Sequence, residues 1–124
     1  MDGRTKVYFT SDAHLGSGYH ADPRAVECRL VRWLQSIEQD ARAVYFLGDM
    51  FDYWFEYRTV VPRGHVRFLG QVALMADQGI EIHFFVGNHD VWFADYLEKE
   101  LGAQVHHEEA IVELDGKTFR LAHG

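Results

Sequence analysis

The sequence has one cysteine, few basic residues and no long apolar segment. Cys28 is the single cysteine among 124 residues, so an internal disulfide is excluded, as suits a reducing cytoplasm. The apolar stretches are shorter than the roughly 18–20 residues that a membrane-spanning helix needs. The 12 Lys and Arg against 19 Asp and Glu give a net charge of −7, which argues against a nucleic-acid partner, because phosphate binding normally needs a basic face.

The first residues also lack the pattern of a signal peptide, because Met1-Asp2-Gly3-Arg4 leads directly into an apolar run. We therefore expect a cytoplasmic protein. Hydrophobic residues at 48% and aromatic residues at 15% are typical of a globular core. With no repeat, linker or low-complexity segment, residues 1–124 are expected to form one domain or part of one.

Apolar runs and helical patterns alternate in the order strand, helix, strand, helix, strand. The expected strands cover residues 7–10, 43–47 and 80–86, and the expected helices cover residues 23–39 and 64–78. Asp22 and Pro23 favour a helix start, and Gly79 favours a helix end. A short helix near residues 91–101 follows, and then a hairpin of strands 110–114 and 118–122 around Asp115-Gly116. The continuous apolar runs predict an α/β fold with a parallel sheet covered on both faces.

Each strand of this β-α-β-α-β core ends in a short motif of Asp, Asn or His, and a fourth motif closes the sequence. The motifs are Ser11-Asp12-Ala13-His14, Gly48-Asp49-Met50-Phe51-Asp52, Gly87-Asn88-His89-Asp90 and Ala122-His123-Gly124. Ligands of parallel sheets gather at the carboxyl ends of the strands. We therefore expect the four motifs to share one edge of the sheet.

The residue types in these motifs are suitable metal ligands. Asp12 and His14 are two positions apart, and in extended backbone such side chains point the same way. Asp49 has two carboxylate oxygens and could bridge two ions, whereas Asn88 offers a neutral carbonyl oxygen and His123 an imidazole nitrogen. Mixed oxygen and nitrogen ligands without a thiolate suit Mn²⁺, Fe or Zn. Two such ions, ~3.5–4 Å apart, would hold the attacking and leaving oxygens of a phosphoryl displacement.

Taken one at a time, the same residues have ordinary structural explanations. Asp12 could lie in a turn, His14 on the surface, and Asp52 could cap a helix or turn. For Asp90 we prefer the interpretation that it caps the helix that follows. His89 is adjacent to Asn88, so it points elsewhere and can remain a free acid or charge donor. The occurrence of all four motifs in this order favours the two-metal site.

The motifs, in this order and on these strands, resemble the calcineurin-like metallophosphoesterase superfamily, over the whole chain. The resemblance implies the N-terminal half of an α/β/β/α sandwich. It implies one metal on Asp12, His14 and Asp49, and a second metal on Asp49, Asn88 and His123. It also implies that His89 assists the transition state or leaving group, held by Asp52.

Within the superfamily, the segments around Asp12, Asp49 and Asn88 resemble the UDP-2,3-diacylglucosamine hydrolases of lipid A synthesis. This resemblance implies a nucleotide-sugar lipid substrate and peripheral contact with the inner membrane. Some of these enzymes carry Arg where this chain has His89. The superfamily's closing G-H-x-H motif is absent, so we expect a truncated chain with strand edges exposed. Two alternatives are a metallophosphoesterase with another phosphoester substrate, and a non-catalytic fragment.

An aromatic run follows Asp52 and comprises Tyr53, Trp54, Phe55 and Tyr57. Trp54 and Phe55 are our candidate substrate contacts, where they could meet acyl chains. The alternative is ordinary core beneath a loop. His20, His106 and His107 have no predicted role and are expected on the surface.

Overall fold

The computed structural model describes residues 3–90 and 92–123, and its centre is a parallel sheet. The sheet has the order β1 (Lys6–Thr10), β2 (Ala41–Phe46), β3 (Glu81–Phe85) and β4 (Gln104–His106), and every neighbouring pair is parallel. The predicted β-α-β-α-β core is therefore confirmed. Strand β4 was not expected, because three residues are too few to give a periodic signal.

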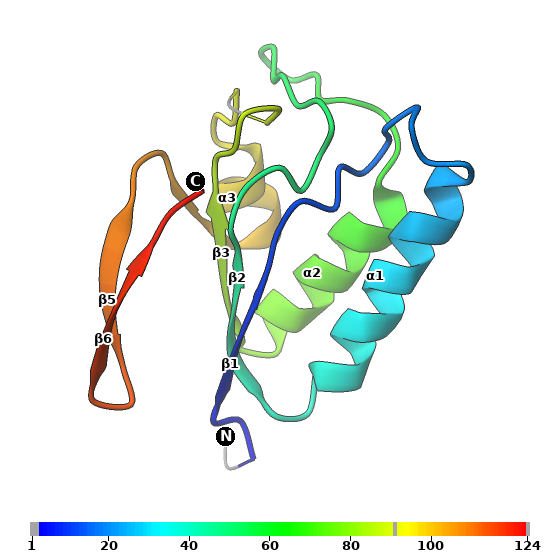
Figure 1. Ribbon diagram of the computed structural model, residues 1–124. Coiled ribbons are helices and arrows are strands. Elements are labelled where there is room, and N and C mark those ends of the chain that lie inside the picture. The colour runs from blue at the N-terminus through cyan, green and yellow to red at the C-terminus, as the bar shows by residue number, and fades with distance from the viewer. Residues whose placement is uncertain (1–2, 91, 124) are drawn as a thin grey trace.

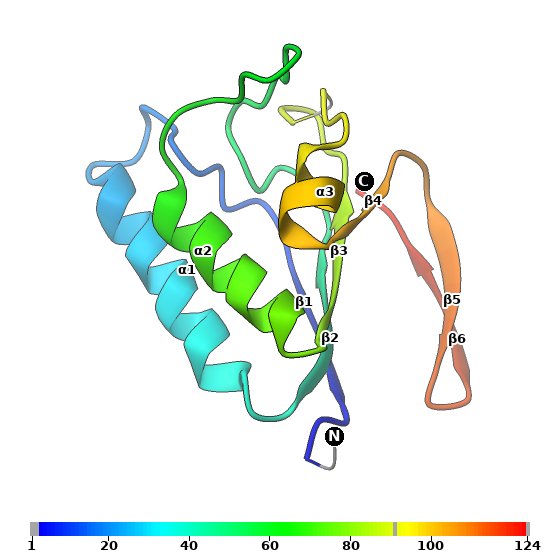
Figure 2. The same ribbon diagram turned by 180° about the vertical axis from the view of Figure 1, so that it is seen from behind.

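Three helices cover one face of the sheet: α1 (Pro23–Ile37), α2 (Val66–Asp77) and α3 (Tyr96–Leu101) (Figures 1 and 2). Helix α1 begins as predicted, because the Asp22 carboxylate accepts a hydrogen bond from the Ala25 N–H at 3.1 Å. Helix α3 is shorter than the predicted segment 91–101 and begins at Tyr96; residue 91 lies outside the described residues. Among the described residues, no helix is long and apolar enough to cross a membrane.

The opposite face of the sheet carries an antiparallel hairpin of β5 (Ala110–Leu114) and β6 (Lys117–Leu121), drawn in orange and red in Figure 1. Asp115 and Gly116 both have positive φ in its turn, as predicted from the Asp-Gly pair. The molecule thus has three layers, in the order helices, parallel sheet and hairpin. The small core under the hairpin consists of Ala43, Tyr45, Phe85 and Leu121.

Burial on both faces holds for the central strands but not for the edge. Strands β2 and β3 are almost wholly buried, whereas β1 is only partly covered. The larger core lies under the helices and includes Phe46, Phe68 and Phe84. Because β1, β2 and β3 are parallel, their carboxyl ends lie at one edge of the sheet, and the chain returns to this edge after β6 (Figure 1).

Candidate metal centre

The loops after β1 and β2 are joined by backbone hydrogen bonds. The Asp12 N–H donates to Gly48 O and the His14 N–H to Asp49 O, both at 3.0 Å. Asp12, His14 and Asp49 all have positive φ, between 47° and 59°, in a region that non-glycine residues seldom adopt. Asp12 and His14 do converge, but the expectation that they lie in extended backbone was wrong, because β1 ends at Thr10. The hydrogen bonds between the two loops determine where the two side chains point.

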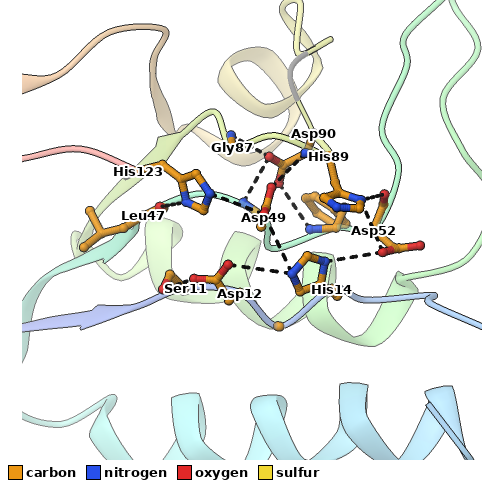
Figure 3. A network of polar contacts seen from close by, with 12 residues as sticks. Ser11, Asp12, His14, Leu47, Asp49, Asp52, Gly87, His89, Asp90 and His123 are labelled. Atoms are coloured by element: carbon orange, nitrogen blue, oxygen red, sulfur yellow. Dashed lines mark hydrogen bonds and ion pairs between the residues drawn. The ribbon is translucent and has the colours of Figure 1, made fainter. Parts of the chain in front are cut away.

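Asp49 is the centre of the cluster and is 4% exposed. Its Oδ1 accepts a hydrogen bond of 2.8 Å from the His89 N–H. Its Oδ2 lies 3.3 Å from His123 Nε2 and 3.7 Å from His14 Nε2 (Figure 3). One carboxylate oxygen is therefore fixed by the backbone and the other lies between two imidazoles from different parts of the chain.

The remaining ring nitrogens define the tautomers of these imidazoles. His123 Nδ1 is 2.9 Å from Leu47 O, and His14 Nδ1 is 3.3 Å from Asp52 Oδ1. A carbonyl or carboxylate oxygen only accepts, so Nδ1 carries the proton in both rings and a neutral ring keeps its lone pair on Nε2. Both lone pairs face Asp49 Oδ2, and that contact is favourable only with a proton or a cation between the atoms. An anchored Nδ1–H is the usual arrangement of a metal-binding histidine.

Asp52 connects His14 with His89. Besides its carboxylate contact with His14, its carbonyl oxygen lies 3.2 Å from His89 Nδ1, and its Oδ1 lies 3.5 Å from the same nitrogen. The His14 and His89 rings meet edge to face, with their centroids 4.9 Å apart. Asp52 therefore orients both rings and leaves the Nε2 atom of His89 available.

Two groups of three residues in the described part of the chain could each hold an ion. The groups are His14, Asp49 and His89, and Asp12, Asp49 and His123, and within each group the ligand atoms lie within 4.8 Å of one another. Asp49 belongs to both, as expected of a bridging ligand. The grouping differs from the one that the resemblance implies: Asp12 is grouped with His123 instead of His14, and His14 is grouped with His89. Asn88 is exposed and borders, with His123, a cavity of about 230 Å³.

The donor chemistry of these groups fits divalent cations. Their carboxylate oxygens and imidazole nitrogens suit Mn²⁺, Fe or Zn, and these residues include no thiolate. Part of the net charge of −7 lies at this site, because the carboxylates of Asp12, Asp49 and Asp52 all contact the His14 ring. Bound cations would balance this local negative charge.

A family model described as calcineurin-like phosphoesterase matches residues 5–124. The chain belongs to this family. It is 69% identical over 121 residues to a UDP-2,3-diacylglucosamine hydrolase of Porphyromonas gingivalis, and 31% identical over 118 residues to one of Nitrosococcus oceani. These matches cover 98% and 95% of this chain but 46% and 45% of the relatives. The chain thus spans about half the length of the curated relatives it matches.

A solved structure supports the fold of this calcineurin-like chain. A protein of unknown function from Aquifex aeolicus matches with a TM-score of 0.60 and 22% identity, over 95% of this chain and 60% of that one. At this identity the likeness concerns the fold alone. Below, "parent protein" means the natural protein that contains the residues described here.

Asp90 has a structural role that the sequence did not reveal. Our expectation that it caps the next helix was wrong, because α3 begins six residues later, behind Asp95. The fully buried Asp90 carboxylate instead accepts hydrogen bonds from the N–H groups of Gly87, Asp49 and Phe51, at 2.8, 3.1 and 3.2 Å. Burial raises the pKa of Asp90, against the opposing effect of these three donors. Asp90 thus joins the loops after β2 and β3, which carry Asp49 and His89.

Two glycines in this calcineurin-like site leave space that a side chain would fill. Gly48 has φ +101°, and a Cβ atom there would lie 2.5 Å from His123 Nδ1. At Gly87 a Cβ atom would lie 2.3 Å from both the N and Oδ1 atoms of Asp49. Glycine at position 87 therefore lets the loop after β3 approach Asp49, and glycine at position 48 lets His123 approach the loop after β2.

We predict that Gly87→Ala weakens both the fold and the metal site of the parent protein. The new methyl group overlaps backbone, which cannot rotate away, and forcing atoms into a packed site typically costs ~1–3 kcal/mol. Urea unfolding should show this loss, and titration with Mn²⁺ should show weaker binding. Gly70→Ala is the matched control, because nothing lies within 4 Å of its added Cβ and it lies in helix α2, where alanine is favoured. Equal stability and metal affinity of the two variants would contradict the prediction.

The structure separates the two predicted substrate contacts. Trp54 is fully buried, its Nε1–H donates to Glu56 Oε2 at 2.9 Å, and its ring packs against Phe51. Its expected contact with acyl chains is therefore corrected, and the core alternative holds for Trp54. Phe55 is 42% exposed and packs against Trp92. His20 is also more than a surface residue, because its Nε2 lies 3.1 Å from the carbonyl oxygens of both Ala13 and His14.

Proposed function

We propose that the parent protein is a metal-dependent hydrolase that cleaves the pyrophosphate of UDP-2,3-diacylglucosamine, a nucleotide-sugar lipid. The products are UMP and 2,3-diacylglucosamine 1-phosphate. The main support is Asp49, whose Oδ2 faces two anchored imidazoles in a chain that is 69% identical to a protein named for this activity. The carboxyl-end position of all four motifs, expected for a phosphoesterase site, agrees with it.

We propose that the site holds two divalent ions, Mn²⁺ in the first place, with Fe or Zn as alternatives. Asp12, His14, Asp49, Asn88 and His123 would hold them, and Asp49 would be shared. When bound, such ions supply positive charge to the reacting phosphate and lower the pKa of bound water. The protein contributes rigidity: the carbonyl of Leu47 and the carboxylate of Asp52 fix the rings of His123 and His14.

His89 and Asp52 form the proposed catalytic pair. His89 Nδ1 faces the Asp52 carbonyl, so this nitrogen is the donor and the ring presents Nε2 at the half-exposed rim of the site. A protonated His89 could stabilise the charge that develops on the departing phosphate. Its proximity to His14 and Asp49 also makes it a possible ligand, and the two roles predict different results.

Replacing His89 by Ala separates these roles. If His89 acts as acid or charge donor, the variant of the parent protein keeps two ions and loses ~10²–10⁴-fold in turnover, as is typical for a removed acid. Metal content by mass spectrometry and kcat on the same sample are the measurements. Glu113→Ala, at an exposed position of β5 that does not line the cavity beside Asn88, is the control. Loss of metal with an unchanged rate per occupied site would refute the catalytic role.

We propose that acyl chains and the membrane surface meet the aromatic residues beyond the site. Phe55, Tyr57, Val60 and Trp92 are exposed, and short β-bridges join Phe55 to Trp92 and Tyr57 to Val60. Aromatic and aliphatic side chains at the edge of a polar site are typical of contact with a lipid interface. This supports peripheral contact of a cytoplasmic enzyme with the inner membrane.

The direct test of the proposed function is UMP release by the purified parent protein from UDP-2,3-diacylglucosamine in the presence of Mn²⁺. We expect UMP and the acylated sugar phosphate in equal amounts. Efficient hydrolysis of a simple phosphodiester without UMP release would instead favour the second candidate, a metallophosphoesterase with another substrate. Membership of the calcineurin-like family and the residues around Asp49 are compatible with that candidate, whereas the name of the 69% identical relative favours the first.

We propose that residues 1–124 are a partial domain and predict that this chain alone has little or no hydrolase activity. The described residues offer about three ligands per ion with one shared, and the G-H-x-H motif of the superfamily is not among them. Losing one ligand per ion weakens binding and loosens the site. Edge strand β1 also has unpaired backbone groups that favour association between copies. Size-exclusion chromatography and a phosphodiester assay with Mn²⁺ test this, and a well-behaved monomer with the turnover of the parent protein would contradict it.

A further inference from the structure

A groove leaves the metal centre on the side of Asp52. Two cavities of about 370 and 270 Å³ share four lining residues, which are Leu15, Gly16, Arg63 and His65. The first cavity also borders Asp52 and Tyr53, and the second extends to Arg24 on helix α1. Because Asp52 contacts both His14 and His89, the groove begins at the residues that would surround the reacting phosphate.

Two arginines, Arg24 and Arg63, line the groove together with the carboxylates of Asp52 and Glu27. Arg24 and Arg63 are both exposed, and neither forms an ion pair with any residue that the structure describes. The carboxylate of Glu27 also borders the groove but is 6% exposed, and its Oε2 accepts the Phe68 N–H at 3.0 Å, at the start of helix α2. Among the described residues the two guanidinium groups have no ion-pair partner and can contact an anion, whereas the Asp52 carboxylate at the end of the groove contacts His14 and His89.

The shape of the groove depends on Gly16. Gly16 has φ +87°, and a Cβ atom there would lie 3.1 Å from His65 Cε1. The His65 ring is held from behind by Phe51, with ring centroids 5.1 Å apart. Tyr53, 61% exposed, borders the end of the groove next to Asp52. The groove thus has a fixed floor, two cations along it and one exposed aromatic ring near the metal centre.

We propose that this groove binds the nucleotide half of the substrate. Arg63 and Arg24 contact the anionic oxygens of the nucleoside phosphate, and Tyr53 stacks on the base. The inference rests on the proposed function, in which the two halves of the substrate diverge from the cleaved pyrophosphate. A guanidinium group can donate two hydrogen bonds to two oxygens of one phosphate, and an exposed aromatic ring can stack on a nucleotide base. The acyl chains need an apolar surface, and Phe55, Tyr57 and Trp92 offer one beside the same site.

The test is UMP binding to the Mn²⁺-loaded parent protein, measured by isothermal titration calorimetry. We expect Arg63→Ala with Arg24→Ala to weaken UMP binding at least ~10-fold, the effect of losing one good charged hydrogen bond. Binding of inorganic phosphate, which reaches only the metal centre, should stay unchanged. Arg29→Ala, an exposed arginine of α1 outside the groove, is the control. Unchanged UMP affinity in the double variant, or an equal loss for phosphate and UMP, would overturn the proposal.

Two further comparisons make the proposal independent of the lipid assay. Tyr53→Leu should weaken UMP more than ribose 5-phosphate, whereas Tyr53→Phe should keep the wild-type ratio; an unchanged ratio in Tyr53→Leu would remove the stacking role. If UMP binds through Arg63 but is not released from the lipid substrate, the proposed function fails and the groove assignment stands. If UMP is released with the wild-type KM by the double variant, the groove assignment fails and the proposed function stands.

Discussion

Asp49→Ala should remove both divalent ions from the parent protein and abolish hydrolysis. Asp49 is the only residue common to the two ligand groups found in the described residues, so its loss takes a ligand from each ion at once. Removing the carboxylate also leaves the Nε2 atoms of His14 and His123, 3.7 and 3.3 Å from its Oδ2, without an anionic partner.

Asp49→Asn distinguishes loss of charge from loss of structure. The amide oxygen can still accept the 2.8 Å hydrogen bond from the His89 N–H, so the loop after β3 should keep its position. An amide bridges two ions poorly, so metal content should still fall from two ions to at most one. Asp77→Ala, at the exposed end of α2, is the control for loss of a carboxylate. Mass spectrometry on protein loaded with Mn²⁺ and then desalted decides the matter, and two ions retained in Asp49→Ala would exclude the bridging role.

The elements of the core could be predicted because each carries its signal within its own residues. The apolar runs of β2 and β3 are buried on both faces, and the Asp22-Pro23 start of α1 forms the expected cap. The prediction was poorer where a contact from elsewhere decides the structure. Helix α2 begins at Val66 behind His65, and it is Glu27, from another helix, that caps its Phe68 N–H. The residues around position 64 give no sign of this contact with Glu27, so the start of the helix was predicted two residues too early.

The candidate site shows the same division between local and distant information. The candidate ligands and their location at the strand ends could be predicted from the motifs, and the structure does bring Asp12, His14, Asp49 and His123 together. The directions of these side chains could not be predicted from the motifs, because they depend on three positive φ angles and on hydrogen bonds between loops. The role of Asp90 was misjudged for the same reason: its partners Asp49 and Phe51 lie about 40 positions earlier in the chain.

Asp90→Ala should be the most destabilising substitution near the site. It leaves the N–H groups of Gly87, Asp49 and Phe51 without their acceptor in a buried position. Each unsatisfied buried donor costs ~1–3 kcal/mol, so we expect a loss of at least about 3 kcal/mol. That is a large part of the ~5–15 kcal/mol that stabilises a typical domain. Urea unfolding of the parent protein with metal chelated measures it, and a loss below about 0.5 kcal/mol, the usual effect of a surface substitution, would contradict the role.

Asp90→Asn tests the same role through its pH dependence. The amide oxygen can accept two of the three N–H groups, whereas the amide nitrogen faces the third, so we expect a smaller loss of ~1–3 kcal/mol. Burial raises the pKa of Asp90 above its ordinary value of 3.8, so the folded protein binds this proton more tightly than the unfolded chain does. The stability contributed by this proton is complete below the ordinary pKa and is lost as the pH rises through the raised one. The advantage of the wild type over Asp90→Asn should therefore shrink as the pH rises from 4 through the raised pKa and stay constant above it. An advantage that grows as the pH rises from 4 would show that the pKa of Asp90 is lowered in the folded protein.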